Sequence, residues 1–332
     1  LCGAAYLWNL RESMQRQGIR QRIKILRLLS KRGFISGEEI ATRCGISRIS
    51  AWKHINHLIS YGVKIKIHPN KGYELISFGN RLLPEIIWLK LGSSQVIKEI
   101  IYLDEIDSTN EYAKRLLKPS SLIIAEQQKK GKGRSGRRWY SQKYKDLLFS
   151  ITVSPDLPYT YIGIFSVVGV LSVVRAINKL YRLKARGKWP NDVVVDSKKI
   201  SGVLIEFFAH MDLIDTLILG IGINVNSFPR LRNTASVRKL LNREVERAQL
   251  LTEVIKLFEE YYYLLEKRQL GKIKKDWMRY SVDYSHRVTL VSAGSKIKGI
   301  SQGIDEYGNL VMNAGKKILI IPPVTDARLL LR

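Results

Sequence analysis

Lys188-Trp-Pro-Asn-Asp-Val-Val-Val-Asp-Ser-Lys-Lys-Ile-Ser-Gly-Val-Leu-Ile-Glu206 sets the fold class of this 332-residue chain. Two β-type runs, 193–195 and 200–207, follow one another in it without a helix between them. The remaining pattern predicts strands at 100–103, 122–125, 147–153 and 217–223, and helices at 109–117, 162–180 and 247–267. Because strands and helices do not alternate strictly, the order predicts an α+β domain rather than a doubly wound parallel sheet.

Two cationic motifs stand out. Lys188-Trp-Pro-Asn-Asp192 places a lysine before a stiff proline, and Gly131-Lys-Gly-Arg-Ser-Gly-Arg-Arg-Trp139 joins flexible glycines to several cations. Glycine lets a backbone approach a ligand closely, and the planar arginine fork binds two phosphate oxygens at once. The glycine spacing matches a dinucleotide loop, but no helix start follows, and neither a Walker nor a kinase loop is completed. Alone, the motif fits a phosphate site or a solvated basic loop equally well.

Composition narrows the class of partner. The formal charge of +27 favours a polyanion such as DNA or nucleotide phosphates, although the cations are spread over the whole chain. Two cysteines cannot form a disulfide framework or a four-ligand zinc site, and no metal-ligand cluster is expected. The apolar run 162–174 ends at Arg175, is too short to span a bilayer, and predicts a buried core helix.

The first residues lack the pattern of a signal peptide. We expect 1–18 to be a nonessential leader, with a possible natural start at Met14. The expected compartment is the cytoplasm, with no membrane contact.

Residues 19–77 predict a winged helix-turn-helix. A helical stripe over 19–31 ends at Gly33, Ser36-Gly-Glu-Glu39 fits a capping box that starts a second helix, and a third helix runs from Ser47 to about Tyr61. Short β-type runs at 63–67 and 72–76 flank a turn. The third helix is the expected recognition helix, and its candidate DNA contacts are Ser47, Arg48, Ser50 and Lys53. A protein-interaction module of the same fold is the alternative.

The chain changes character from 284 onward. Short runs at 288–291, 296–300, 310–312 and 318–321 are separated by glycine-containing turns, which predicts a small β-barrel.

Five sequence blocks in order carry a resemblance to a known family. They are Asp107-Ser-Thr-Asn110, Ala125-Glu-Gln-Gln128, the two cationic motifs and Gly220-Ile-Gly-Ile-Asn-Val-Asn226. Together they resemble biotin protein ligase, and the N-terminal region resembles the DNA-binding domain of the form that is also the biotin-operon repressor. The resemblance spans about 19–332. It implies a central mixed-sheet, class II synthetase-like ligase domain at 78–283 and an SH3-like C-terminal domain at 284–332.

The resemblance also implies a two-step reaction. Biotin and ATP, with Mg²⁺, give biotinyl-adenylate, and a lysine of the biotin carboxyl carrier protein then takes the biotin. The adenylate is expected to act as corepressor on operator DNA and to favour a homodimer.

The matching positions give the candidate site. Lys188 and Arg134 are the expected catalytic residues. The expected biotin contacts are Ser108, Thr109, Asn110, Gln128, Gly131, Lys132, Arg134 and Lys188. The expected ATP and adenylate contacts are Lys132, Arg134, Trp139, Lys188 and Asn224.

Several positions keep a second interpretation. Ser108 also fits a helix cap, and Trp139 fits ordinary core packing. Asn191 and Asp192 orient Lys188, help to place magnesium or stabilise a turn. The segment 227–236, which contains no tryptophan, is expected to cover the adenylate.

Three other functions stay open at this stage: a ligase without repression, a lipoate ligase, and a regulator that senses ligand without catalysis.

Overall fold

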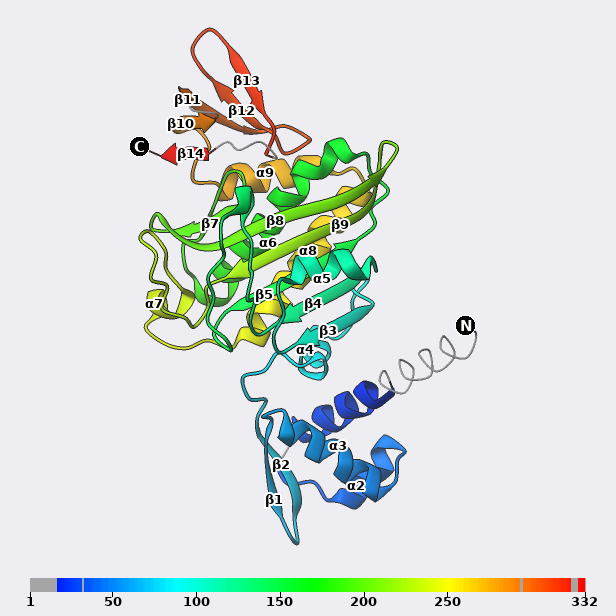
Figure 1. Ribbon diagram of the computed structural model, residues 1–332. Helices are drawn as coiled ribbons and strands as arrows, with labels where there is room; N and C mark the ends of the chain where they lie inside the picture. The colour runs from blue at the N-terminus through cyan, green and yellow to red at the C-terminus, as the bar shows by residue number, and fades with distance from the viewer. Residues whose placement is uncertain (1–16, 32, 293–294, 324–327, 332) are drawn as a thin grey trace. The chain divides into compact units, whose positions relative to one another are not determined.

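The computed structural model describes residues 17–31, 33–292, 295–323 and 328–331. These residues form two compact units, which divide between Ser93 and Ser94 (Figure 1). The expected leader lies outside the described residues except for 17–18, which begin the first described helix.

The N-terminal unit is a winged helix-turn-helix, as predicted. Its helices are residues 17–29, α2 (Gly37–Cys44), α3 (Arg48–Ser60) and α4 (Pro84–Leu91). The hydroxyls of Ser36 and Ser47 accept hydrogen bonds from the backbone N–H groups of Glu39 and Ser50, which starts α2 and α3 as the capping pattern predicts. Gly45 ends α2 in the left-handed conformation, with φ 67°. Apolar residues of the first three of these helices form the core, among them Ile25, Leu26, Ile40, Ile55 and Leu58.

The wing is an antiparallel hairpin of β1 (Lys64–His68) and β2 (Gly72–Ser77). Ile35 pairs with Tyr73 in an isolated antiparallel bridge, so the chain before α2 is hydrogen-bonded to the wing. Gly72 is required there, because a Cβ would lie 2.1 Å from the Ile35 carbonyl oxygen. The helix α4 was not predicted and belongs to this unit rather than to the second.

The second unit is built on a seven-stranded sheet in the order β3-β4-β5-β9-β8-β7-β6. The strands are β3 (Glu99–Leu103), β4 (Ser121–Ala125), β5 (Leu147–Val153), β6 (Arg186–Lys188), β7 (Asp192–Val195), β8 (Lys198–His210) and β9 (Leu213–Ile223). Only β3 and β4 pair in parallel within this sheet; the other neighbours are antiparallel. The predicted α+β class with a mixed sheet is confirmed, and β6 is the strand that the pattern did not reveal.

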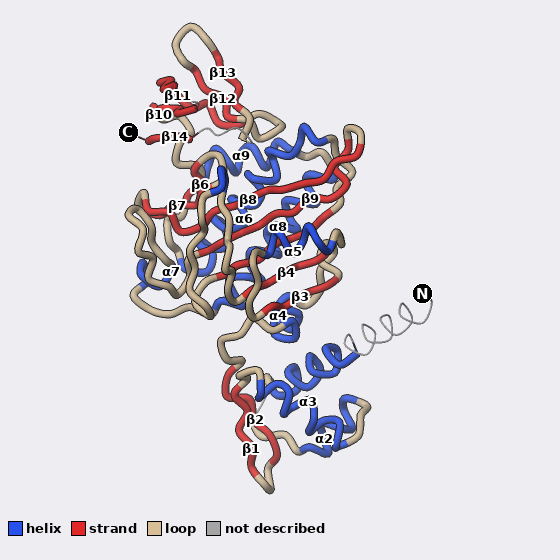
Figure 2. Tube along the Cα trace, in the orientation of Figure 1, coloured by secondary structure: helices blue, strands red, loops and turns tan. Residues whose placement is uncertain are grey.

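Helices cover the sheet on both faces (Figure 2). They are α5 (Thr109–Leu116), α6 (Ile162–Tyr181), α7 (Val237–Leu241), α8 (Arg247–Glu266) and α9 (Leu270–Tyr280), with short 3-10 turns at Arg134–Gly136 and Tyr159–Tyr161. The segment Tyr159–Tyr181 is long and apolar enough to cross a membrane, but 83% of its apolar window is buried inside the protein. It is the predicted core helix of this unit.

The C-terminal part is a five-stranded antiparallel sheet in the order β13-β12-β11-β10-β14. Its strands are β10 (Arg287–Ser292), β11 (Ser295–Ile304), β12 (Leu310–Asn313), β13 (Ile318–Ile321) and β14 (Arg328–Leu331). Four of these were predicted, whereas β14 and the helix α9 that leads into the sheet were not.

Candidate active site

The expected site residues meet in one cavity of about 710 Å³ in the second unit. Its lining includes Ser108, Thr109, Asn110, Gln128, Lys132, Arg134, Trp139, Lys188 and Asn224. Gly131 is the expected site residue that does not line the cavity. It is the first residue of the loop, and a Cβ there would be 2.9 Å from the Trp139 carbonyl oxygen, so a glycine allows the two arms of the loop to meet.

One wall is the start of α5. Ser108 is buried and its hydroxyl caps the helix by accepting from the Glu111 N–H at 3.5 Å. The backbone N–H and the hydroxyl of Thr109 both donate to Oε1 of Gln128, at 2.7 and 3.0 Å. These bonds fix the orientation of the Gln128 amide. The wall therefore presents short polar groups in a set geometry, which suits a neutral polar ring with donors and an acceptor.

Asn110 holds this wall to the sheet. Its Nδ2 donates to Oε2 of Glu206 at 2.8 Å, and its Oδ1 accepts from the Ser150 hydroxyl at 2.6 Å. Gly220 makes room for it, because a Cβ there would lie 2.2 Å from Oδ1. Both ends of the Asn110 amide are thus engaged inside the protein.

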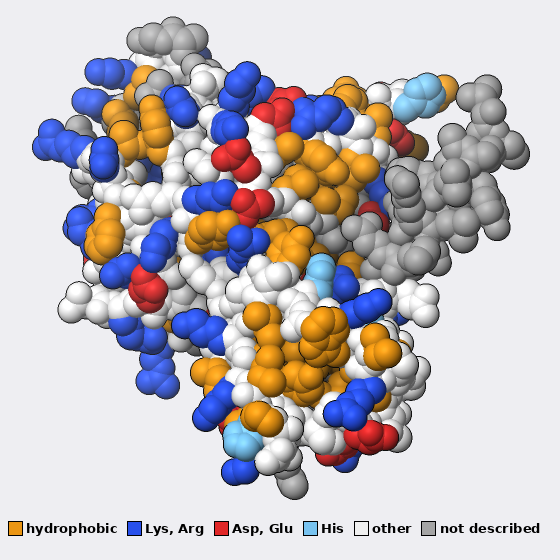
Figure 3. Space-filling view, turned by 60° about the horizontal axis from the view of Figure 1, so that its bottom comes forward, with side chains coloured by type: hydrophobic (Ala, Val, Ile, Leu, Met, Phe, Trp, Pro, Cys, Tyr) orange, Lys and Arg blue, Asp and Glu red, His pale blue; other side chains and the backbone are white. Residues whose placement is uncertain are grey.

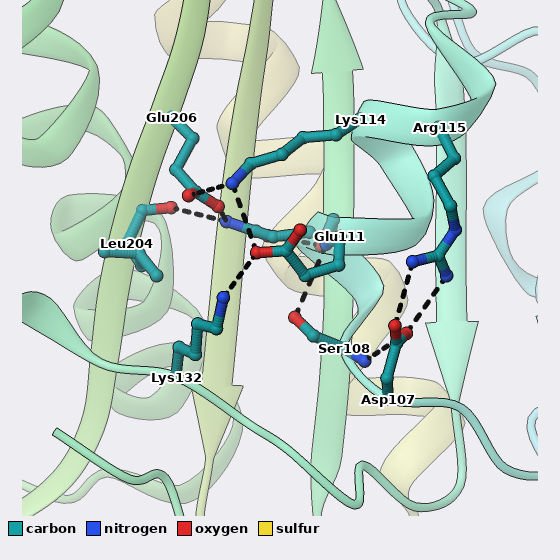
Figure 4. A network of polar contacts seen from close by, with 10 residues as sticks. Asp107, Ser108, Glu111, Lys114, Arg115, Lys132, Leu204 and Glu206 are labelled. Carbon is teal, nitrogen blue, oxygen red and sulfur yellow. Dashed lines mark hydrogen bonds and ion pairs between the residues drawn. The ribbon is translucent and has the colours of Figure 1, made fainter. Parts of the chain in front are cut away.

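An ion-pair network surrounds this wall (Figure 4). Oε1 of Glu111 accepts from Nζ of Lys132 at 2.6 Å and from Nζ of Lys114 at 3.2 Å, and Lys114 also pairs with Glu206 at 2.5 Å. The hydrogen bond from Lys132 is the main reason why the pKa of Glu111 lies below its usual value. Glu111 therefore ties the glycine loop to α5.

The glycine loop folds as a narrow turn over the cavity. The Gly133 N–H donates to the Arg137 carbonyl at 2.6 Å, and the Trp139 N–H donates to that of Gly131 at 2.9 Å. Ser135 has φ 53°, so a residue other than glycine takes the left-handed conformation here. Arg134 reaches the second cationic motif, with its Nη1 3.4 Å from Oδ1 of Asn191. The two motifs that stand out in the sequence thus touch each other.

The lysine motif is the turn between β6 and β7. Lys188 and Asp192 are opposite each other in the antiparallel backbone pairing of these two strands. The peptide bond between Trp189 and Pro190 is cis. Asn191 makes two hydrogen bonds to the backbone of Val203 in β8. Its side-chain Nδ2 donates to the Val203 carbonyl at 2.6 Å, and its backbone carbonyl accepts from the Val203 N–H at 2.9 Å. The Pro190 carbonyl accepts from the Ser166 hydroxyl of α6 at 2.7 Å. The turn is therefore fixed by a buried hydrogen bond to α6 and by partly buried ones to β8.

Trp189 carries a second set of contacts, which the sequence did not reveal. It is 1% exposed; its indole N–H donates to the Gly308 carbonyl and its backbone N–H to Oδ1 of Asp283, both at 3.3 Å. Asp283 also accepts from the Ser301 hydroxyl. Burial raises the pKa of Asp283 to about 6, and the hydrogen bond from the Trp189 N–H is the largest influence that opposes this rise. The segment that leads into the C-terminal sheet thus braces the lysine turn.

The floor of the cavity is made by glycines of β8 and β9. Trp139 is half-buried, and a Cβ at Gly222 would lie 2.5 Å from its ring. Nζ of Lys199 lies 5.5 Å from the ring centroid and 2.6 Å from Oδ1 of Asp192. Asn224 is buried, and its Nδ2 donates to the Ala235 carbonyl at 3.2 Å, so it holds down the segment that was expected to cover the adenylate.

No group of three or more His, Cys, Asp or Glu side chains that would hold a metal occurs among the residues placed by the structure. Asp192 is a carboxylate that lines the cavity next to the lysine turn. Mg²⁺ is commonly bound by one or two carboxylates together with substrate phosphates, so this arrangement fits a metal that enters with a nucleotide.

The candidate DNA contacts lie at the start of α3 in the other unit. Arg48 and Lys53 are exposed, Ser50 is half-buried, and the Ser47 hydroxyl is the helix cap. Arg48 and Lys53 thus present their charges to solvent, whereas Ser47 is used within the helix.

Comparison with known proteins follows this division of the chain. The model of the biotin/lipoate A/B protein ligase family matches residues 102–224, and that of an HTH domain matches residues 20–74. The bifunctional ligase/repressor BirA of Bacillus spizizenii is 30% identical over 306 residues, which cover 89% of this chain and 94% of that protein. BirA of Escherichia coli (strain K12) is 30% identical over 304 residues, covering 87% and 91%.

A solved structure of a biotin protein ligase has a similar fold. The biotin protein ligase from Aquifex aeolicus, in complex with biotin and ATP, is 28% identical with a TM-score of 0.62, and the match covers 71% of this chain and 100% of that one. Similarity over nearly the whole length of the relatives, with an HTH domain before a ligase domain, shows that this chain belongs to the family of bifunctional ligase/repressors.

Proposed function

We propose that this biotin protein ligase forms biotinyl-adenylate from biotin and ATP and transfers the biotin to a lysine of the biotin carboxyl carrier protein, in the cytoplasm. One observation carries the proposal: both cationic motifs and the polar start of α5 line the same cavity. Its volume of about 710 Å³ lies within the range of ordinary small-molecule sites. The relatives favour biotin over lipoate as the substrate.

In the first step, an oxygen of the biotin carboxylate attacks the α-phosphorus of ATP and pyrophosphate leaves. Two anions must approach each other, so fixed positive charge is the main catalytic requirement. Lys188 supplies this charge from its braced turn, and Arg134 supplies a second cation from the glycine loop. One cation about 4 Å from the reacting charge contributes on the order of 4 kcal/mol at an effective dielectric near 20.

The polar wall holds the other end of biotin. Ser108, Thr109 and Gln128 offer short donors and acceptors to the ureido ring, with Asn110 supporting them from the sheet side. Lys132 lies at the edge of the cavity, where it can move from Glu111 to a carboxylate or phosphate. Trp139 and Asn224, which both line the cavity, pack around the adenine in this proposal.

In the second step, the neutral amine of the acceptor lysine attacks the biotinyl carbonyl, and AMP leaves with the bonding electron pair. The mixed anhydride must stay bound until the acceptor arrives. Arg134 and the glycine loop retain it through contacts to its phosphate. Mg²⁺ neutralises phosphate charge when it is bound, and Asp192 is the side chain that would hold it.

We also propose that the winged helix-turn-helix, residues 19–77, binds operator DNA as a repressor. The adenylate is then both reaction intermediate and corepressor, and it favours a homodimer. Arg48 and Lys53 contact the DNA from the exposed side of α3, and Ser47 and Ser50 lie at its start. This coupling requires that the adenylate bind the dimeric form more tightly than the monomer.

The test is an ATP- and magnesium-dependent transfer assay. Purified protein is mixed with a biotin carrier domain and with either biotin or lipoate, and the mass of the acceptor is recorded. A gain of the mass of biotin, dependent on ATP, supports the ligase. No gain with biotin but a gain with lipoate would replace it by a lipoate ligase, and no gain with either would leave a ligand-sensing regulator.

A further inference from the structure

The exposed face of the recognition helix is more apolar than the expected DNA contacts indicate. Ile49 is 69% exposed and Trp52 is 53% exposed, and they lie three residues apart on the same face of α3. Large apolar side chains that stand side by side in solvent mark an interaction site. Figure 3 shows hydrophobic side chains gathered on the N-terminal unit, bordered by lysine and arginine side chains.

The two serines at the start of α3 are less available to a partner than Ile49 and Trp52. The Ser47 hydroxyl accepts from the Ser50 N–H at 3.1 Å and is used as the cap, and Ser50 is half-buried. Ile49 and Trp52 are exposed on this face, and Arg48 and Lys53, which are their neighbours in the sequence, are exposed too. Any molecule that α3 touches with its first two turns therefore meets apolar groups next to cations.

The charge of this region indicates what that molecule is. No acidic residue occurs in the sequence between Glu39 and Glu74. The same segment carries Arg43, Arg48, Lys53, Lys64, Lys66 and Lys71. A second copy of this surface would bring like charges together, whereas a polyanion complements it.

Double-stranded DNA offers one apolar group in its major groove, the 5-methyl group of thymine. We propose that Ile49 and Trp52 contact thymine methyl groups, so that α3 recognises a thymine-containing half-site by apolar contact while Arg48 and Lys53 bind phosphates. The inference rests on the proposed repressor function and adds to it the base that is read and the residues that read it. Loss of one methyl contact is expected to weaken binding about fourfold.

The experiment removes the methyl group from the DNA rather than from the protein. A duplex is first enriched from a randomised pool by the full-length protein in the presence of biotin and ATP. It is then synthesised with uracil in place of each thymine, which keeps every base-pair hydrogen bond and deletes only the methyl group. Fluorescence anisotropy measures the affinity of both duplexes for the unaltered protein and for Trp52→Ala and Ile49→Ala.

We expect uracil at the contacted positions to weaken binding by the unaltered protein at least fourfold, and Trp52→Ala to lose most of that sensitivity. Met211→Ala, which removes an 86% exposed apolar side chain from the second unit, is the matched control and should keep it. An unchanged circular-dichroism spectrum and thermal unfolding curve of Trp52→Ala would show that the N-terminal unit of the variant is folded. The uracil duplex needs no variant, so a misfolded Trp52→Ala would not remove the test.

Three outcomes would overturn the inference. If no duplex is enriched, the repressor proposal fails and the inference fails with it. If a duplex is enriched but uracil has no effect, repression stands and apolar base recognition is wrong. If Trp52→Ala changes the sedimentation coefficient but not the effect of uracil, the face binds a second copy of the chain.

Discussion

The two cationic motifs of the cavity differ in how they are held. The lysine turn is fixed by buried groups, with Trp189 1% exposed and Asn191 bonded at both ends to β8. The glycine loop is held by its own backbone bonds, by the contact of Arg134 with Asn191 at 3.4 Å, and by the pair between Lys132 and Glu111, whose side chains are 52% and 27% exposed. Exposed ion pairs contribute about 0–1 kcal/mol, whereas leaving a buried donor unpaired costs about 1–3 kcal/mol. The lysine turn thus has more buried contacts than the glycine loop, and we expect the loop to move more readily.

This difference suggests a division of labour. A charge that stabilises a transition state acts best when it needs no reorganisation, which suits Lys188. A charge that retains an intermediate and later lets product leave must open and close, which suits the loop. Changes to the turn should therefore lower the rate of adenylate formation, and changes to the loop should alter retention.

The largest effect is expected for Lys188→Ala. Loss of about 4 kcal/mol of transition-state stabilisation corresponds to a rate of adenylate formation about 10³-fold lower. Pyrophosphate release under single-turnover conditions measures it. Lys198→Ala, which removes an exposed cation of β8 outside the cavity lining, is the matched control. Equal losses in both variants would show that charge in general, rather than the lysine turn, drives the step.

The second effect is expected for Arg134→Gly. Loss of its charge-assisted hydrogen bonds to the adenylate should speed release of the intermediate about 10–100-fold. Released biotinyl-adenylate reacts with exposed lysines, so bulk proteins in the assay should become biotinylated. Mass spectrometry of a mixture of carrier domain and serum albumin distinguishes the results. Labelling of the carrier alone would contradict a retaining role.

The third effect concerns the brace behind the lysine turn. Asp283→Ala leaves the Trp189 N–H without its acceptor, and we expect kcat of adenylate formation to fall about tenfold with little change in the KM for biotin. Asp283→Asn keeps an oxygen acceptor and should restore most of the rate. If both variants raise KM and leave kcat unchanged, the brace does not position Lys188.

The pH dependence of stability tests independently whether Asp283 is buried against Trp189. Burial raises the pKa of Asp283 from 3.8 to about 6, so the folded protein binds this proton more tightly than the unfolded chain. The contribution is fully present below pH ~4 and is lost as pH rises through 6, lowering the free energy of unfolding by about 3 kcal/mol at most. Urea unfolding across this pH range measures the free energy of unfolding of the unaltered protein and of Asp283→Asn. We expect it to fall with rising pH in the unaltered protein by up to about 3 kcal/mol more than in Asp283→Asn.

Local pattern predicted most of the strands and helices, whereas the residues of the cavity wall were named from the resemblance to biotin protein ligase. The strands at 147–153 and 318–321 have the predicted bounds, and the Ser36 and Ser47 caps lie at the predicted helix starts. The strand β6 has three residues and includes Gly187 and Lys188, so no alternation revealed it.

The brace was missed for a different reason. Asp283 lies 94 residues from Trp189 and Gly308 lies 119 residues away, and no spacing rule joins such positions. The pairing of Lys132 with Glu111 was missed because charge alone does not choose among many acidic partners. Contacts made by tertiary packing required the structure.

The smallest effect is expected for Glu111→Gln, which tests the mobile side of the comparison. The charge of Glu111 holds Lys132 at 2.6 Å, and a neutral amide would hold it less firmly. Because both side chains are partly exposed, the pair contributes less than about 1 kcal/mol, so the affinity for biotin should rise only about twofold to threefold. Isothermal titration calorimetry measures it, with Glu99→Gln, which breaks the pair with Lys118 outside the cavity lining, as the control. A lower affinity for biotin would mean that Glu111 preorganises the loop instead of competing with the ligand for Lys132.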